Sequence, residues 1–436
     1  MDWVLVSVLM MGGIMAAIGV GIPVAFGFLA LNLIGAWFIM GGMAGVAQSV
    51  SNATSSLTVY ALTPIPMFMI MGELFFRTGL APRVFDALEL LMGRIPGRLS
   101  HLTIGGGTLF AALSGSSIAN TAMMGGLMVP NMVQRNYKLH MIVGPIMAAG
   151  GLAILIPPSG LGVLLGSLAR IDIGALLIAG IMPGLILAGM YFIMVIVQTK
   201  IDPSSAPAYE VREISWSEKF KAVAVNVLPM GLVIFAVIGV IILGIATPTE
   251  ASAFGVLAVL VLALLYRCLT WSSIVLTLES AMRVTVMLLL IIMGSSTFSQ
   301  LLAFSGASTG MVEWATGFDV SPTVILIMMF LVLVVLGCFM DQVSMLMLTL
   351  PIFMPITLKF GFDPVWFGII LMMSLEISLF TPPFGLLLFV MLGVAPKGTT
   401  LGQVSMAGLP YLACQFILVA LIVMFPKIAL WLPSLM

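Results

Sequence analysis

Residues 156–160 read IPPSG, and 225 residues later residues 381–385 read TPPFG. Proline removes a backbone donor and clashes with the preceding helical turn, and glycine tolerates non-helical dihedrals. The motifs interrupt two apolar segments, at 140–168 and 364–393, that are otherwise long enough to cross a bilayer. They therefore predict a pair of broken membrane helices.

The offset of 225 residues holds beyond these two motifs. With 24 prolines in 436 residues, chance predicts roughly 0.6 proline pairs at one offset. The pairs present at this offset are Pro23 with Pro248, Pro130 with Pro355, Pro157 with Pro382, and Pro158 with Pro383. We therefore predict a first repeat at 1–200, a connector at 201–222 and a second repeat at 223–436.

The composition places the chain in a membrane. Hydrophobic residues make up 61% of it and charged residues 7%, whereas soluble proteins are about one quarter charged. The net charge is zero and no basic tract is present, so nothing favours nucleic acid as a partner. We expect an all-α membrane protein with about ten transmembrane helices, near 3–22, 24–45, 59–76, 140–168, 173–198, 223–245, 250–266, 284–303, 364–393 and 404–432.

Polar residues interrupt two further apolar segments, at 103–130 and 322–356. The first interruption reads SGSSIANT at 114–121, and the second reads DQVS at 341–344. The arms on either side are too short to cross, and a non-helical tip at membrane depth is tolerated only where protein or a water-filled cavity covers it. We therefore predict two re-entrant hairpins.

Basic residues place the two hairpins on opposite sides of the membrane. The stretch 303–363 around the second hairpin holds only Lys359. The residues that flank the first are Arg77, Arg83, Arg94, Arg98, Arg135 and Lys138. Under the positive-inside rule the first hairpin enters from the cytoplasm and the second from the periplasm. The two repeats are then inverted.

Inverted repeats with broken helices are the plan of many secondary transporters, which bind substrate and ions near the bilayer midplane. Freed carbonyls and hydroxyls can bind a small hard cation, and helix N-termini attract an anion. We expect two cation sites. The first draws on Ser114, Gly115, Ser116, Ser117, Asn120 and the backbone of Pro158, Ser159 and Gly160. The second draws on Asp341, Gln342, Ser344, Thr381 and the backbone of Pro383 and Gly385.

Substrate contacts are expected from Ser117, Asn120, Thr121, Ser344 and Glu376. Glu376 is ionisable and lies inside a crossing, which marks a functional position by default, and a buried structural hydrogen bond is the alternative. Asp341 has the alternative role of capping a hairpin helix. For the glycines and serines of the tips, the alternative is close helix packing. Thr247 and Glu250 predict a capping box at a helix start.

Five stretches resemble the large membrane subunit of tripartite ATP-independent periplasmic (TRAP) transporters. They are SGSSIANTA at 114–122, LIPPSG at 155–160, ATPTEASAFG at 246–255, GCFMDQVSMLMLTLPIFMP at 337–355 and LFTPPFG at 379–385. The resemblance implies sodium-driven uptake of an organic acid, such as a C4-dicarboxylate or a sialic acid, across the bacterial inner membrane. It implies an elevator mechanism, a periplasmic binding protein and a small four-helix membrane subunit. Because no helix precedes Met1, that subunit is expected on a separate chain.

Three other functions are alternatives to this one. A symporter of related fold would take sodium and a carboxylate without a binding protein. A passive channel would carry polar stripes on several helices, and none is evident. A membrane-embedded enzyme would need a catalytic motif such as His-Glu-x-x-His or paired aspartates within the crossings, and the sequence contains neither.

Overall fold

A computed structural model describes residues 2–93, 95–207, 215–317, 321–337, 340–382 and 385–435. These residues form helices and no strand. Six helices are long and apolar enough to span a membrane, and six shorter apolar helices accompany them. The all-α membrane fold predicted from the sequence is confirmed.

The helices of the first half are α1 (Trp3–Gly19), α2 (Val24–Ile39), α3 (Met43–Leu57), η1 (Tyr60–Leu62), α4 (Pro64–Arg77), α5 (Leu80–Leu91), α6 (Arg98–Ser114), α7 (Ser117–Gln134), α8 (Leu139–Gly151), η2 (Leu152–Ile154), α9 (Gly160–Ala169), α10 (Ile173–Ile201) and η3 (Pro203–Ser205). Those that follow are α11 (Trp216–Ala222), the π-helical turn η4 (Val223–Val227), α12 (Leu228–Ile242), α13 (Pro248–Leu265), α14 (Trp271–Phe304), α15 (Ala307–Thr316), α16 (Pro322–Leu336), α17 (Gln342–Lys359), α18 (Pro364–Phe380), α19 (Leu386–Val394), α20 (Leu401–Met424), α21 (Lys427–Leu430) and η5 (Pro433–Leu435).

The same offset relates the helices of the two halves. Both ends of α7 map onto those of α17, because 117 + 225 = 342 and 134 + 225 = 359. The starts of α8 and α18 also lie 225 residues apart, at residues 139 and 364. One local difference is that α3 and α4 together correspond to the single continuous helix α14. The proline offset seen in the sequence is therefore an offset between helices.

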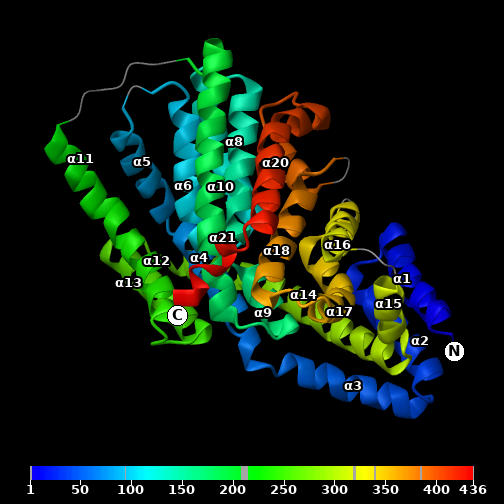
Figure 1. Ribbon diagram of the computed structural model, residues 1–436. Coiled ribbons are helices and arrows are strands. Elements are labelled where there is room, and N and C mark those ends of the chain that lie inside the picture. The colour runs from blue at the N-terminus through cyan, green and yellow to red at the C-terminus, as the bar shows by residue number, and fades with distance from the viewer. Residues whose placement is uncertain are drawn as a thin grey trace.

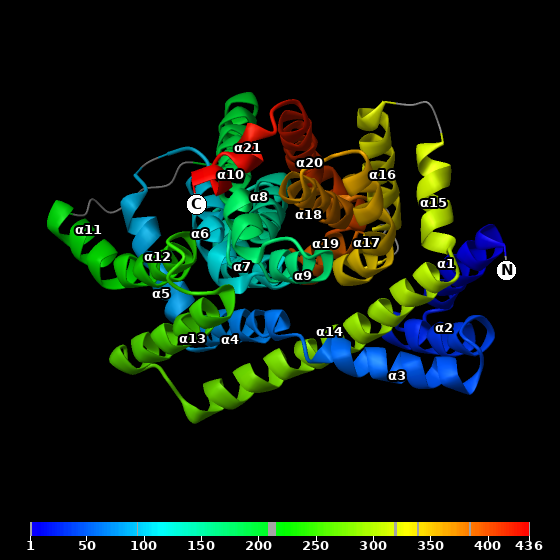
Figure 2. The same ribbon diagram turned by 60° about the horizontal axis from the view of Figure 1, so that its bottom comes forward.

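The helices form a central bundle and an outer layer. The bundle contains the hairpin helices and the broken helices, with α8, α10 and α20 side by side (Figure 1). In Figure 2, α14 runs diagonally along one side of the molecule, with α4 and α13 toward one end and α2 and α3 toward the other. The bundle therefore packs against a layer dominated by one long helix.

Helices α10 and α20 join the two halves inside the bundle. The rings of Tyr191 and Tyr411 meet edge to face, with centroids 5.5 Å apart. Gln415 Nε2 donates to the Tyr191 hydroxyl at 3.0 Å, and the Tyr411 hydroxyl donates to Gln198 Oε1 at 3.0 Å. Such buried hydrogen bonds fix the relative position of the two helices because leaving either group unpaired is costly.

Several helix boundaries differ from the sequence predictions. The helix expected at 24–45 ends at Ile39, since Gly41 and Gly42 both adopt positive φ. The helix expected at 59–76 begins at Pro64, and the one expected at 284–303 begins at Trp271, after the N-cap Thr270. Four helices, α3, α5, α11 and α15, were not expected. Each is too short or too polar to resemble a crossing.

Cysteine accessibility tests the inverted orientation. Asp86 on α5, before the first hairpin, and Ser321, the N-cap of α16 at the start of the second hairpin, are both exposed. In a variant that lacks the native cysteines, Asp86→Cys should react with a membrane-impermeant maleimide only from the cytoplasmic side. Ser321→Cys should react only from the periplasmic side, because the positive-inside rule inverts the repeats. Labelling of both positions from one face contradicts the inversion.

Candidate functional site at the two hairpin tips

The first hairpin turns at Gly115, between α6 and α7. Gly115 adopts a left-handed conformation with φ +56°, which is strained for residues with a side chain. Ser116 then caps α7, and its hydroxyl accepts a hydrogen bond from Ala119 N at 3.4 Å. The tip is therefore a tight turn that leads directly into a helix N-terminus.

The first tip rests on the break between α8 and α9. A Cβ added at Gly115 would lie 3.0 Å from Pro158 O and 3.2 Å from Gly160 N, so only glycine fits here without displacing its neighbours. Ser159 caps α9, and its hydroxyl accepts from Gly162 N at 3.2 Å. Two helix N-termini, of α7 and α9, therefore lie close to each other.

Asp341 caps the second hairpin helix, α17. Its Oδ1 accepts hydrogen bonds from Val343 N at 3.0 Å and Ser344 N at 3.1 Å, and its Oδ2 accepts a short bond from the Ser344 hydroxyl. The capping role considered in the sequence analysis is thus present. The carboxylate also lines the cavity described below, so capping does not remove it from the site.

The second broken helix consists of α18 and α19, with the break between them. The Thr381 hydroxyl donates to Ile377 O at 2.8 Å, and Gly385 N donates to Thr381 O at 3.1 Å. Gly385 packs against the backbone of Leu379, at a distance that leaves no room for a Cβ. Pro383, expected to contribute its backbone, lies outside the described residues.

Glu376 connects the two hairpins from the middle of α18. Its side chain is fully buried, and its Oε2 accepts hydrogen bonds from Ser117 Oγ at 2.7 Å and Gln342 Nε2 at 3.2 Å. Ser117 begins α7 and Gln342 begins α17. One carboxylate oxygen therefore holds both hairpin helices at their N-terminal ends.

A cavity of about 240 Å³ lies between the two tips and the outer layer. The tips contribute polar groups to its wall from Ser114, Gly115, Ser116, Asp341 and Gln342. Opposite them, the wall is apolar and comes from α4 and α14, through Ile65, Phe68, Met69, Val284, Met287 and Leu288. The cavity therefore has one polar side, made by both halves of the bundle, and one apolar side.

The structure brings together some of the expected site residues and places others behind them. Gly160 joins the five tip residues on the cavity wall. Those behind the wall include Ser117, Asn120, Thr121, Ser159, Ser344, Glu376 and Gly385, all of them buried. Asn120 is an example, because its Nδ2 donates to Gly107 O and Ala149 O at 3.3 and 3.0 Å. Pro158 and Thr381 are not on the cavity wall either.

Sequence reasoning missed the apolar side of the cavity. Phe68 and Leu288 lie on helices in which most residues are apolar, and nothing in the sequence separates the few that face a cavity from those that face lipid or other helices. The polar side was visible because the clustered serines around Gly115 and the pair Asp341 and Gln342 interrupt the apolar pattern.

Comparison with known proteins decides the family. Residues 9–428 match the family described as the tripartite ATP-independent periplasmic transporter, DctM component. The chain belongs to this family. The C4-dicarboxylate TRAP transporter large permease protein DctM of Pseudomonas aeruginosa is 32% identical over 86% of this chain and 86% of its own length. The sialic acid TRAP transporter large permease protein SiaM of Vibrio cholerae is 30% identical over 98% of this chain and 99% of its own.

A solved structure shares the fold of this DctM-family chain. The YdaH transporter of Alcanivorax borkumensis superposes with a TM-score of 0.65 at 13% identity and covers 91% of this chain and 90% of its own. The resemblance to TRAP transporters noted from the sequence is confirmed. The chain is a multi-pass permease of the bacterial inner membrane that serves secondary solute transport, and its relatives are permeases rather than enzymes.

Substitution of Gly115 tests the packing of the first tip. Gly115→Ala should lower the stability of the purified protein by about 1–2 kcal/mol, because alanine is strained at φ +56° and its Cβ meets the Pro158 carbonyl. The measurement is the midpoint of thermal unfolding in detergent. Gly126→Ala on α7 is the control, since a Cβ there has no neighbour within 4 Å. Equal midpoints for the two variants contradict this account of the tip.

Proposed function

We propose that the permease couples the inward movement of sodium to uptake of a small organic acid, by an elevator movement of the bundle. The observation that carries this proposal is the cavity in which both hairpin tips and the break before α9 meet. Secondary transporters bind substrate and coupling ions where inverted repeats place their broken helices. The cavity has the composition that such a site needs.

The polar side of the cavity suits a small cation and a carboxylate together. Hydroxyl and backbone oxygens near Ser114 and Ser116, and the carboxylate of Asp341, are the oxygen ligands that hard cations prefer. The N-termini of α7 and α17 begin directly after these residues and carry positive partial charge. We infer sodium sites at the two tips, with the carboxylate of the substrate between them.

The apolar side of the cavity suits a moving bundle. Side chains such as Phe68 on α4 and Leu288 on α14 offer no hydrogen bond to a polar partner, so sliding of the tips past them breaks none. Glu376 holds the two hairpins to one another during such a movement. The bundle then carries its site as one unit against the layer formed by α4 and α14.

The names of relatives support a proposal for the partners and the class of substrate. Two relatives carry names that specify a C4-dicarboxylate and a sialic acid, which are both carboxylates. We propose a substrate of this class, a periplasmic binding protein that delivers it, and a small membrane subunit on a separate chain. The alternative is a sodium and carboxylate symporter that works without a binding protein.

Uptake by proteoliposomes tests the coupling. In vesicles that contain the permease and its small membrane subunit, an inward sodium gradient should drive uptake of a C4-dicarboxylate or a sialic acid in the presence of the binding protein. The rate should rise more steeply than first order with sodium, because two ions bind. Hyperbolic dependence, or full activity on a proton gradient without sodium, contradicts the proposal. Equal uptake without the binding protein selects the alternative symporter.

Asp341 tests the second cation site. Asp341→Asn keeps the cap on α17, since asparagine caps helices as well as aspartate does, but it removes the charge. Half-saturating sodium for uptake should rise at least several-fold. Asp363→Asn is a matched control, because Asp363 caps α18 by accepting bonds from Val365 N and Trp366 N at 2.8 and 3.0 Å and does not line the cavity. Unchanged sodium affinity in Asp341→Asn assigns Asp341 to capping alone.

A further inference from the structure

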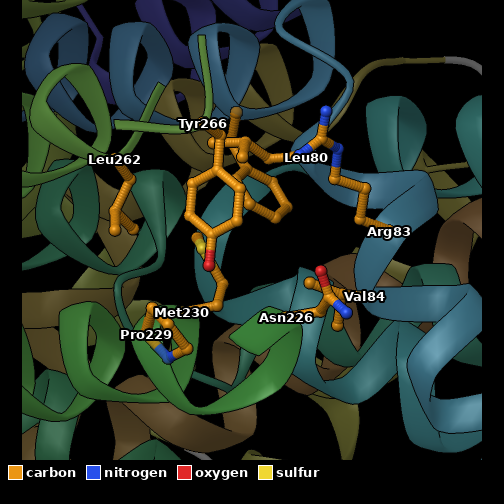
Figure 3. Close-up of a pocket in the computed structure, with 9 residues that line it drawn as sticks. Leu80, Arg83, Val84, Asn226, Pro229, Met230, Leu262 and Tyr266 are labelled. Atoms are coloured by element: carbon orange, nitrogen blue, oxygen red, sulfur yellow. The ribbon is translucent and has the colours of Figure 1, made fainter. Parts of the chain in front are cut away.

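Besides the cavity at the hairpin tips, the fold contains a narrow crevice on the outer side of the first hairpin. Its mouth lies between α5, the turn η4 and the end of α13, and is lined by Leu80, Arg83, Val84, Asn226, Leu262 and Tyr266 (Figure 3). Phe75, Pro229 and Met230 complete the wall. The crevice is apolar except for Arg83, Asn226 and the Tyr266 hydroxyl.

The crevice continues from this mouth along α12. A second section shares Val84 and Met230 with the first and extends to Leu109 and Phe110 on α6 and to Gly231 and Ile234 on α12. Only apolar residues line it. Each section has a free volume of about 10 Å³, which is room for roughly one water-sized group. A hydrocarbon chain therefore fits along the open edge of the crevice rather than inside it.

Arg83 leaves a positive charge at the mouth of the crevice. Its guanidinium carbon lies 5.4 Å from the centroid of the Tyr266 ring, and the Tyr266 hydroxyl donates a short hydrogen bond to Val225 O. Within the described part of the chain, Arg83 forms no ion pair with a carboxylate. The ring holds the guanidinium over the crevice while its donors remain available to an anion.

The surroundings of the mouth have the composition of a membrane interface. The helix α11 packs on α5 and η4, and it exposes Trp216 and Phe220 beside Lys219 and Lys221. Lys219 Nζ lies 5.1 Å from the Trp216 ring centroid. Exposed aromatic rings next to basic side chains are typical of residues at headgroup depth. The positive-inside rule assigns this end of the hairpin to the cytoplasmic leaflet, which carries anionic lipid.

We propose that this crevice binds an anionic phospholipid, whose phosphate contacts Arg83 and whose acyl chain lies along the open edge of the crevice beside α6 and α12. The charge at the mouth matches the phosphate, and the apolar section below it matches the chain. Basic pockets between membrane helices on the cytoplasmic side bind lipid headgroups in the same way. The lipid covers the open edge of the crevice between the first hairpin and α12.

Native mass spectrometry of the full-length protein in detergent tests the proposal. The probes are phosphatidylglycerol, phosphatidylcholine and inorganic phosphate. Phosphatidylglycerol should remain bound at least fivefold more than phosphatidylcholine, and inorganic phosphate should not displace it. Arg83→Gln should abolish that preference, because it removes the charge and keeps a side chain of similar length.

Two further variants separate headgroup from chain binding. Gly231→Leu should reduce retention of phosphatidylglycerol at least fivefold, because a Cβ at Gly231 meets no atom within 4 Å and a larger side chain fills the crevice. The controls are Gly239→Leu on the same helix and Arg283→Gln, an exposed arginine on α14. Equal retention of both lipids, or retention that neither Arg83→Gln nor Gly231→Leu lowers, overturns the proposal. Displacement by inorganic phosphate assigns the mouth to a free anion and overturns the lipid.

Discussion

An unpaired backbone group inside a bilayer costs several kcal/mol, and the central bundle is arranged around this constraint. Among the described residues, the helices that follow the tips and the breaks are α7, α9, α17 and α19, and the side chains of Ser116, Ser159 and Asp341 cap the first three of them. Capping pairs some of the exposed N–H groups and leaves others free. Both tips and the break before α9 line one cavity, so the remaining groups would be available to the cation and the carboxylate of the proposed function. A single helix break leaves unpaired backbone groups that cost free energy, whereas several breaks around one cavity place such groups where a ligand could pair with them.

Glu376 joins the two halves of the bundle behind the hairpin tips. A buried carboxylate with no partner is unfavourable, yet this one accepts hydrogen bonds from the first residue of each hairpin's second helix. Loss of either donor leaves this buried carboxyl group with fewer hydrogen-bond partners, which is costly, so the two hairpins are held in a fixed relation. Another contact between the halves, where Tyr191 meets Tyr411, lies in the same bundle. On the opposite wall of the cavity the lining residues of α4 and α14 are apolar, and α14 reaches the second hairpin helix through Ser295, whose hydroxyl donates to Met347 O at 2.9 Å.

The sequence predicts those elements of the fold at which polar residues, proline or glycine interrupt an apolar segment. The two helix breaks at the proline motifs, the 225-residue offset between helices and the interruption of the first hairpin near Gly115 follow from it, and the capping box at Thr247 and Glu250 is confirmed. The helices α3, α5, α11 and α15 do not follow, because short amphipathic or polar segments resemble loops. The sequence also does not reveal which side of a hairpin helix faces the cavity. Ser116 and Asn120 lie one helical turn apart, and of the two only Ser116 lines the cavity. Burial of that kind depends on neighbours that are distant in the chain.

The central claim is that both tips and both broken helices move as one unit against the outer layer. Electron paramagnetic resonance can measure distances between spin labels at Asn131 on α7, Met406 on α20 and Leu264 on α13, all exposed. In membranes that contain the assembled transporter, the Asn131–Met406 distance distribution should keep a single population. The Asn131–Leu264 distance should show two populations whose ratio changes when sodium replaces potassium. A change confined to the Asn131–Met406 distance, with Asn131–Leu264 constant, contradicts the claim.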